Sequence, residues 1–107
     1  MNTNAKEHLE KLVGRMSLGK AIRAIRQGEN ENQINFAQRL GVSKQYLCDL
    51  EHDRKIVSAK KAKQFAETLG YSPEHFIALA LQDSLEQDGI HMMVEVKTYQ
   101  TKNLSFS

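Results

Sequence analysis

Hydrophobic residues recur at helical spacing along most of the chain. Leu9, Leu12, Val13 and Met16 keep the i, i+3, i+4, i+7 spacing of one helix face, which predicts a helical extension over residues 1–17. The same period returns in five later stretches, which are bounded by polar residues that cap helices and by glycines that end them. The pattern therefore predicts five helices between residues 18 and 88, over the stretches 18–27, 33–40, 44–53, 59–69 and 73–88.

After Gly89 the pattern changes to a period of two. Ile90, Met92, Val94 and Val96 fall on one face as far as Tyr99, which is typical of a β-strand. A single strand leaves both of its backbone edges unpaired, so it needs a partner. We expect residues 89–107 to form a strand and tail that pair with a second copy, giving a homodimer held by these four apolar side chains. The apolar stripe of the N-terminal helix is the alternative place for that contact.

Charge is unevenly distributed along the chain. The net charge of the 107 residues is +2, but residues 20–63 hold ten Lys or Arg and five Asp or Glu. Residues 64–96 hold six Asp or Glu and no Lys or Arg. A basic half followed by an acidic half indicates that the first faces a polyanion and the second faces something else.

Composition narrows the class of protein. The chain is long enough for one domain, and no apolar run reaches the 18 residues of a membrane helix. The N-terminus lacks the apolar core of a secretory signal, and the single cysteine, Cys48, cannot form an internal disulfide. We therefore expect a cytoplasmic protein.

The segment from Gln33 to Asp53 has the pattern of two short helices joined by a tight turn. Ala37 provides the small side chain that a helix crossing needs, and Gly41 suits a left-handed turn residue. Leu47 and Leu50 fix the second helix to the core and leave a polar outer face. A helix of this diameter fits the major groove of DNA.

Residues 18–80 resemble the phage-repressor, or Xre/Cro-type, helix-turn-helix domains of DNA-binding transcriptional regulators. The resemblance lies in Gln33 and in the stretches FAQRLGVS (36–43), LCDLE (47–51) and FAETLGYSPEHF (65–76). It departs at Ile34, where the family tends to be polar, and at Asp49, where a basic or amide side chain is common. The resemblance implies operator binding and repression. The fold class is then mainly α: a five-helix repressor-like helix-turn-helix bundle over residues 18–88, with an N-terminal helical extension and a C-terminal β-strand for dimerisation.

The resemblance and side-chain chemistry together assign candidate DNA contacts. Lys44 and Gln45 open the second helix of the motif and are expected to reach base edges, lysine at guanine and glutamine at adenine. Tyr46 joins them through a thymine methyl or a phosphate. The expected phosphate contacts are Gln33, Ser43, Arg54, Lys55, Lys60 and Lys61. Alternatively, these lysines and arginines form a basic surface that contacts only solvent.

An acid in the middle of this surface needs its own explanation. Asp49 lies one turn after Gln45 and could accept a hydrogen bond from cytosine N4, so it is counted among the base contacts. Alternatively it pairs with Lys44 or His52 and orients them.

Other chemistry finds little support. Cys48 and His52 have an i, i+4 spacing that could hold two metal ligands, but zinc needs three or four. A nucleophilic Cys48 would need a base, an orienting group and a pocket, and nothing in the sequence marks such a set. We expect no metal, no cofactor and no enzymatic activity.

We therefore predict a sequence-specific DNA-binding transcriptional regulator, a repressor that binds a palindromic operator in double-stranded DNA as a homodimer. One alternative is an antitoxin whose acidic half neutralises a toxin protein while the dimer represses its own operon. A second is a protein-interaction module that uses the strand edge.

Overall fold

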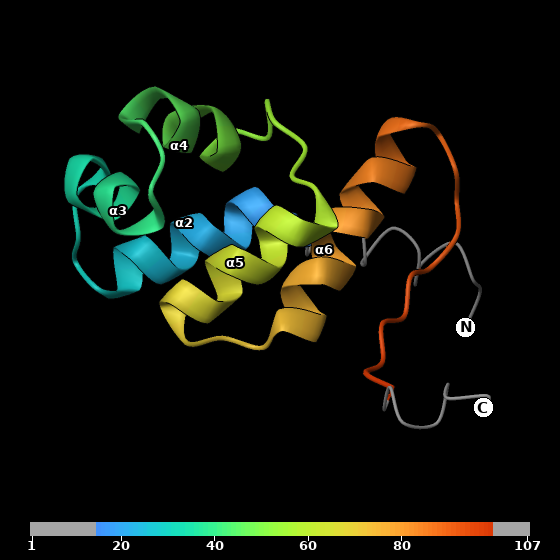
Figure 1. Ribbon diagram of the computed structural model, residues 1–107. Coiled ribbons are helices and arrows are strands. Elements are labelled where there is room, and N and C mark those ends of the chain that lie inside the picture. Colours follow the sequence, from blue (N-terminus) through green and yellow to red (C-terminus); the bar gives the residue numbers. More distant parts are fainter. Residues whose placement is uncertain (1–14, 100–107) are drawn as a thin grey trace, which may run out of the picture.

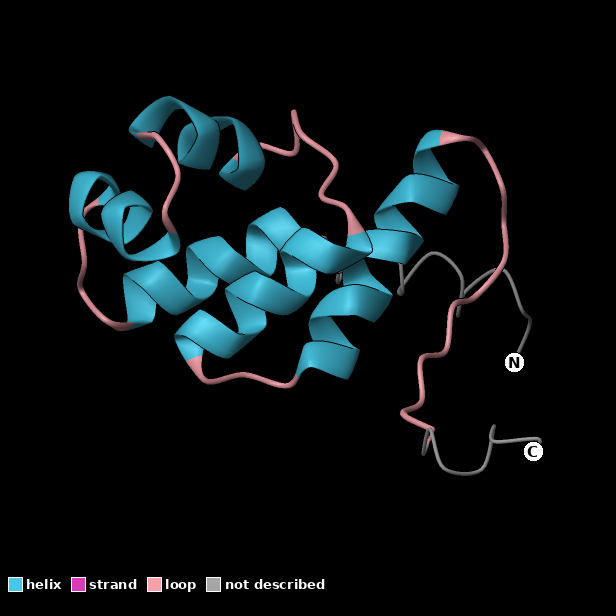
Figure 2. Ribbon diagram, viewed as in Figure 1, coloured by secondary structure: helices cyan, strands magenta, loops and turns pink. Residues whose placement is uncertain are grey.

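The computed structural model describes residues 15–99, and within this range all regular secondary structure is helical (Figures 1 and 2). The elements are α2 (Leu18–Gly28), α3 (Gln33–Leu40), α4 (Lys44–Glu51), α5 (Ala59–Leu69) and α6 (Pro73–Gln87). They fit the predicted mainly α helix-turn-helix bundle. The predicted extension over residues 1–17 lies outside the described residues, apart from its last three positions.

Side-chain caps explain where these helices begin. Before each helix, a serine or asparagine in extended conformation accepts a hydrogen bond from the backbone N–H three residues later, which satisfies one of the free donors of the first turn. The five caps are Ser17, Asn32, Ser43, Ser58 and Ser72. Gly41 and Gly70 follow α3 and α5 with φ of 73° and 76°, a conformation that glycine adopts without strain.

One predicted boundary was wrong by two residues. α4 ends at Glu51 rather than at residue 53, and Asp53 has a φ of 60°. A left-handed aspartate is uncommon but tolerated, because its short polar side chain can bond locally. The side chain of Asp53 accepts a hydrogen bond from the Ser17 hydroxyl, so the end of α4 is tied to the cap of α2.

The core lies where the five helices meet. α5 packs on α6, α3 packs on α4 and α5, and α2 packs on α4 and α6. The largest side chains with less than 2% exposure are Phe36, Phe76, Leu18, Ile22, Leu47 and Leu50. Both helices of the motif, α3 and α4, thus contribute apolar side chains to one common cluster.

Gly19 allows α2 to approach α4 closely. A Cβ at this position would lie 1.8 Å from the carbonyl oxygen of Leu50, which is backbone and cannot move aside like a side chain. The helical periodicity did not indicate this contact, because a glycine inside a helix is usually interpreted only as a weak helix former.

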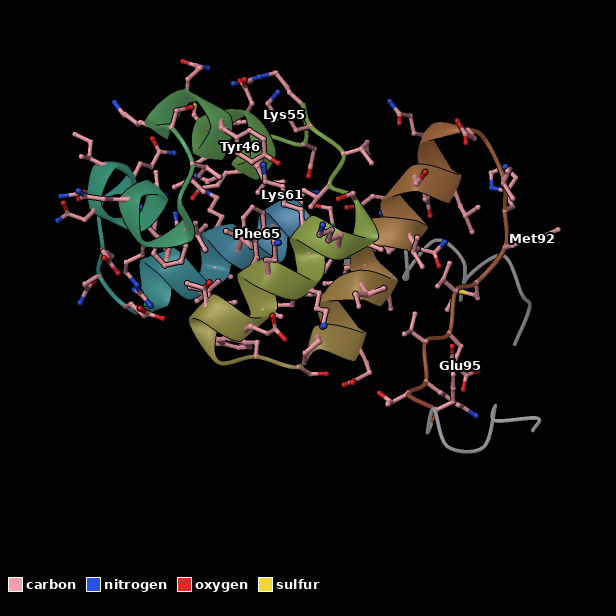
Figure 3. All side chains as sticks on the ribbon, viewed as in Figure 1. Tyr46, Lys55, Lys61, Phe65, Met92 and Glu95 are labelled. Carbon is pink, nitrogen blue, oxygen red and sulfur yellow. The ribbon has the colours of Figure 1, made fainter. Side chains whose placement is uncertain are left out.

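The predicted C-terminal β-strand was wrong. Residues 90–99 form an extended loop that runs past α6 without joining a sheet (Figure 2). The predicted apolar face is also divided, since Val94 and Val96 are half-buried whereas Ile90 and Met92 are 38% and 68% exposed. Met92 points away from the helices in Figure 3.

A glutamine side chain provides the hydrogen bonds that a neighbouring strand would have made. The Gln82 amide donates to the Met92 carbonyl and accepts from the Val94 N–H, each at 2.8 Å. Thr98, later in the loop, donates to Glu74 in the first turn of α6 at 2.6 Å. Alternation of apolar residues predicts a strand only where a second backbone is present to pair with it, and residues 15–99 contain no other extended segment placed to do so. The predicted dimer contact through Ile90, Met92, Val94 and Val96 depended on this strand, which residues 90–99 do not form.

Within residues 15–99, no helix has both the length and the hydropathy needed to cross a lipid bilayer.

Candidate nucleic-acid interface

The segment from α3 to α4 presents a short polar helix at one end of the molecule (Figure 1). Gly41 turns the chain, and the Val42 N–H donates to the Ala37 carbonyl, which closes the end of α3. α4 then buries Leu47 and Leu50, while its first two residues, Lys44 and Gln45, are exposed. The N-terminal turn of α4 is therefore open to a ligand on its outer side.

A buried carboxylate holds α4 against α2 and α3. Glu51 is 2% exposed and receives two hydrogen bonds from the Arg26 guanidinium, at 2.7 and 3.0 Å, and one from the Gln33 amide at 2.9 Å. Burial acts to raise the pKa of Glu51, but the hydrogen bonds from Arg26 and Gln33 outweigh it and leave that pKa below its usual value. The ionised carboxylate thus fixes the orientation of α4.

The ring of Tyr46 lies close to two lysines from outside α4. The Lys61 ammonium lies 4.5 Å and the Lys55 ammonium 5.1 Å from the centre of the Tyr46 ring (Figure 3). Both distances are within the range of a cation–π interaction. Burial raises the pKa of the Tyr46 phenol, so the ring stays neutral at physiological pH. Together with Lys44, which is exposed at the start of α4, these two lysines make the helix and its surroundings positively charged.

Asp49 is bonded to its neighbours on the outer face of α4. Its Oδ1 accepts from Gln45 Nε2 and from Arg54 Nε, each at 3.0 Å. The hydrogen bond from Arg54 holds the pKa of Asp49 below its usual value. The expected partners were Lys44 or His52, and this was wrong in detail: His52 Nδ1 lies 2.8 Å from the carbonyl oxygen of Cys48 instead. Asp49 does pair with a neighbour on the outer face of α4, but that neighbour is Gln45.

Comparison with known proteins identifies the domain. A family model described as a helix-turn-helix domain matches residues 19–81, which is more than half of the chain. The chain belongs to this helix-turn-helix family. Its members are Xre/Cro-like DNA-binding regulators, as the resemblance had indicated. No curated protein and no solved structure matches the chain.

Most of the candidate DNA contacts of this helix-turn-helix protein lie on or beside α4. Lys44, Gln45, Tyr46 and Asp49 belong to the helix, Ser43 caps it, and Arg54 and Lys55 follow it. Lys60 and Lys61 lie in the first turn of α5, and the contact between Lys61 and Tyr46 places that turn next to α4.

Two of the predicted phosphate contacts have other partners in the structure. The Gln33 amide is bonded to Glu51, and the Arg54 guanidinium is bonded to Asp49. The Ser43 hydroxyl accepts from the Tyr46 N–H as the helix cap, which leaves its own O–H free to donate. Of the other expected phosphate contacts, Lys60 is exposed in the first turn of α5, and the ammonium groups of Lys55 and Lys61 lie over the Tyr46 ring.

The ion pair that fixes α4, between Arg26 and Glu51, was not predicted from the sequence, because 25 residues separate the two. One signal pointed to Glu51: it follows Leu50 and lies four residues after Leu47, so it falls on the apolar face of its helix. An acid at such a position needs a buried cation.

Among the described residues, no group of three or more His, Cys, Asp or Glu side chains could hold a metal ion.

Proposed function

We propose that this helix-turn-helix protein is a sequence-specific transcriptional repressor that inserts α4 into the major groove of its operator. The observation that carries the proposal is the exposed first turn of α4, with the side chains of Lys44 and Gln45 open to solvent on a helix whose opposite face is fixed by Leu47, Leu50 and Glu51. A rigidly held helix with a polar N-terminal turn suits base readout, because the residues nearest the groove floor keep one position.

The contacts divide into two groups in this proposal. Lys44 reaches guanine acceptors and Gln45 reaches adenine, so these two residues choose the sequence. Lys55 and Lys61 at the Tyr46 ring, together with Lys60, bind phosphates on either side of the groove and set the orientation of the helix.

Two copies read one operator. α4 has eight residues and is therefore only about 12 Å long, which allows contact with a few base pairs. Specific affinity from so short a helix calls for two half-sites, which are read by a homodimer on a palindromic sequence about one helical turn apart. The protein acts in the cytoplasm, where it meets the DNA.

Selection of bound sequences from a random DNA pool at a fixed salt concentration tests the proposal. The wild-type chain should enrich a palindromic motif, and the variant Lys44→Ala/Gln45→Ala should enrich none. Lys63→Ala/Gln64→Ala is the matched control, since it removes the same two residue types from exposed positions on α5 and should enrich the wild-type motif. Equal enrichment by both variants would mean that α4 does not read bases.

The acidic half of the chain supports a second candidate. Residues 64–96 carry six acids without a Lys or Arg, although Arg15, Lys63 and Lys97 from outside the stretch form ion pairs with four of them, and Met92 and Met93 are 68% and 91% exposed in the loop after α6. Such a surface suits a basic protein partner, as in an antitoxin that neutralises a toxin and represses its own operon. Co-expression with the product of an adjacent small reading frame tests this, because that product should inhibit growth alone and not with this chain.

A further inference from the structure

The hydrogen bond from Gln45 to Asp49 uses one N–H of the Gln45 amide and does not involve its oxygen or its other N–H. Adenine is read by an amide that accepts from N6 with its oxygen and donates to N7 with one N–H. The Asp49 contact can therefore be kept while Gln45 pairs with a base.

Free glutamine side chains on a helix surface have many rotamers. One hydrogen bond to a residue one turn further along α4 restricts Gln45 before DNA arrives, and this reduces the conformational entropy that binding would cost. The Asp49 side chain is itself held, because Arg54 donates to the same oxygen at 3.0 Å. The three side chains form a chain of contacts in the order Arg54, Asp49, Gln45.

An acid facing DNA would ordinarily weaken binding, since phosphates repel a carboxylate. Here the Arg54 guanidinium lies 3.0 Å from Asp49 and compensates its charge. The acid can thus serve as a hydrogen-bond acceptor with little net repulsion.

We propose that Asp49 is a positioning residue for sequence choice: it orients the Gln45 amide for adenine while Arg54 offsets its charge. The inference rests on the proposed function, since it concerns how α4 reads a base. In this proposal Arg54 binds Asp49, whereas the sequence predicted that it contacts a phosphate. The proposal also explains why an acid can lie where the family commonly has a basic or amide side chain.

A double-mutant cycle on the full chain tests the inference. The probes are a duplex carrying the motif that wild-type protein selects and a scrambled duplex of the same composition, at one salt concentration. Asp49→Ala should reduce the ratio of the two affinities about tenfold, a loss within the range for one base contact. In the Gln45→Ala background, Asp49→Ala should leave the ratio unchanged.

Glu67→Ala is the control for charge, because it removes one exposed acid from α5 and should leave the ratio at the wild-type value. Thermal unfolding of each variant establishes that α4 remains folded. An unchanged ratio for Asp49→Ala would overturn the inference. A drop of equal size with and without Gln45 would also overturn it, because Asp49 would then read a base directly. If the wild-type chain selects no motif at all, it is the proposed function that fails.

Discussion

Gly19 sets the distance between α2 and α4. A Cβ at this position would lie only 1.8 Å from the Leu50 carbonyl oxygen, which leaves no room for any side chain, so the backbones touch where other helix pairs interpose side chains. Because Leu50 is next to Glu51, this contact and the buried ion pair fix the same end of α4.

We expect Gly19→Ala to destabilise the protein by about 1–3 kcal/mol through overpacking, despite the better helix propensity of alanine. Gly28→Ala is the control, since nothing lies within 4 Å of a Cβ at that position in the same helix. Urea unfolding monitored by circular dichroism measures both. Equal stability of the two variants would show that α2 can move away from α4 at no cost.

Tyr46 acts through its ring in the contacts that the structure shows. Tyr46→Phe keeps a ring for Lys55 and Lys61, so its affinity for the selected operator should stay within about twofold of wild type, while Tyr46→Leu should lose affinity for all sequences alike. Fluorescence anisotropy with operator and scrambled duplexes distinguishes the two effects. If Tyr46→Phe is as weak as Tyr46→Leu, the phenol hydroxyl is what matters and the lysine pair is incidental.

At the scale of the elements, one carboxylate joins three helices. Glu51 of α4 is bonded to Arg26 of α2 and to Gln33 at the start of α3. Removing its charge would leave the Arg26 guanidinium without its compensating charge, and breaking a buried pair costs about 3–5 kcal/mol.

Acid should destabilise the protein because it protonates the Glu51 carboxylate. The pKa of Glu51 is lower in the folded than in the unfolded chain, so its contribution is complete above the usual value of 4.5 and disappears as the pH falls through the folded value. Glu51→Gln should be less stable at pH 7 and should change less between pH 7 and pH 3. Glu67→Gln, at an exposed position, should follow the wild-type curve in chemical denaturation across that range. If the stability of Glu51→Gln falls between pH 7 and pH 3 as steeply as that of the wild type, other carboxylates cause the acid dependence.

The element boundaries show what local sequence can predict. Helix starts at Ser43, Ser58 and Ser72 and the turn at Gly41 were predicted correctly, because caps and left-handed glycines act within three or four residues. The strand over residues 90–99 was wrong because a strand depends on a distant backbone. A glutamine in α6, at position 82, cannot be recognised from the sequence as a substitute for one.

The extended loop offers a direct test of that substitution. Gln82→Ala removes both hydrogen bonds to the backbone of residues 92 and 94, so amide hydrogens of this loop should exchange faster while the thermal midpoint of the helical core changes little. Gln64→Ala, an exposed glutamine on α5, should leave the exchange pattern unchanged. Unaltered exchange at Val94 in Gln82→Ala would mean that the Thr98 to Glu74 bond suffices to hold the loop.

At the scale of the whole molecule, charge divides along the fold. The positive groups around α4 and the start of α5 precede an α6 and C-terminal loop rich in acids. The division is a property of the sequence, and the structure adds that Lys55 and Lys61 converge on Tyr46. The pairing of Arg54 with Asp49, and of Gln33 with Glu51, depends on side-chain geometry that no count of charges contains.

Binding to DNA should accordingly depend steeply on salt. If two copies together neutralise about 6–10 phosphates, affinity should fall by about 10³–10⁵ between roughly 50 and 200 mM monovalent salt. Lys55→Ala should make the slope of log affinity against log salt shallower, and Gln45→Ala should not. Anisotropy titrations at a series of salt concentrations give the slopes. A slope near zero for the wild-type protein would rule out phosphate contacts as the main source of affinity.

The two bonds from Gln82 involve only main-chain atoms of the loop, the Met92 carbonyl and the Val94 N–H. Every amino acid has the first atom, and every amino acid except proline has the second. Over evolutionary time, the side chains at positions 92 and 93 are therefore free to diversify while the loop keeps its course. Homologous chains that retain glutamine at 82 should show variable residues at 92 and 93 and should lack proline at 94. Substitutions at these two positions can therefore change the surface of the loop without altering the helices of the helix-turn-helix domain.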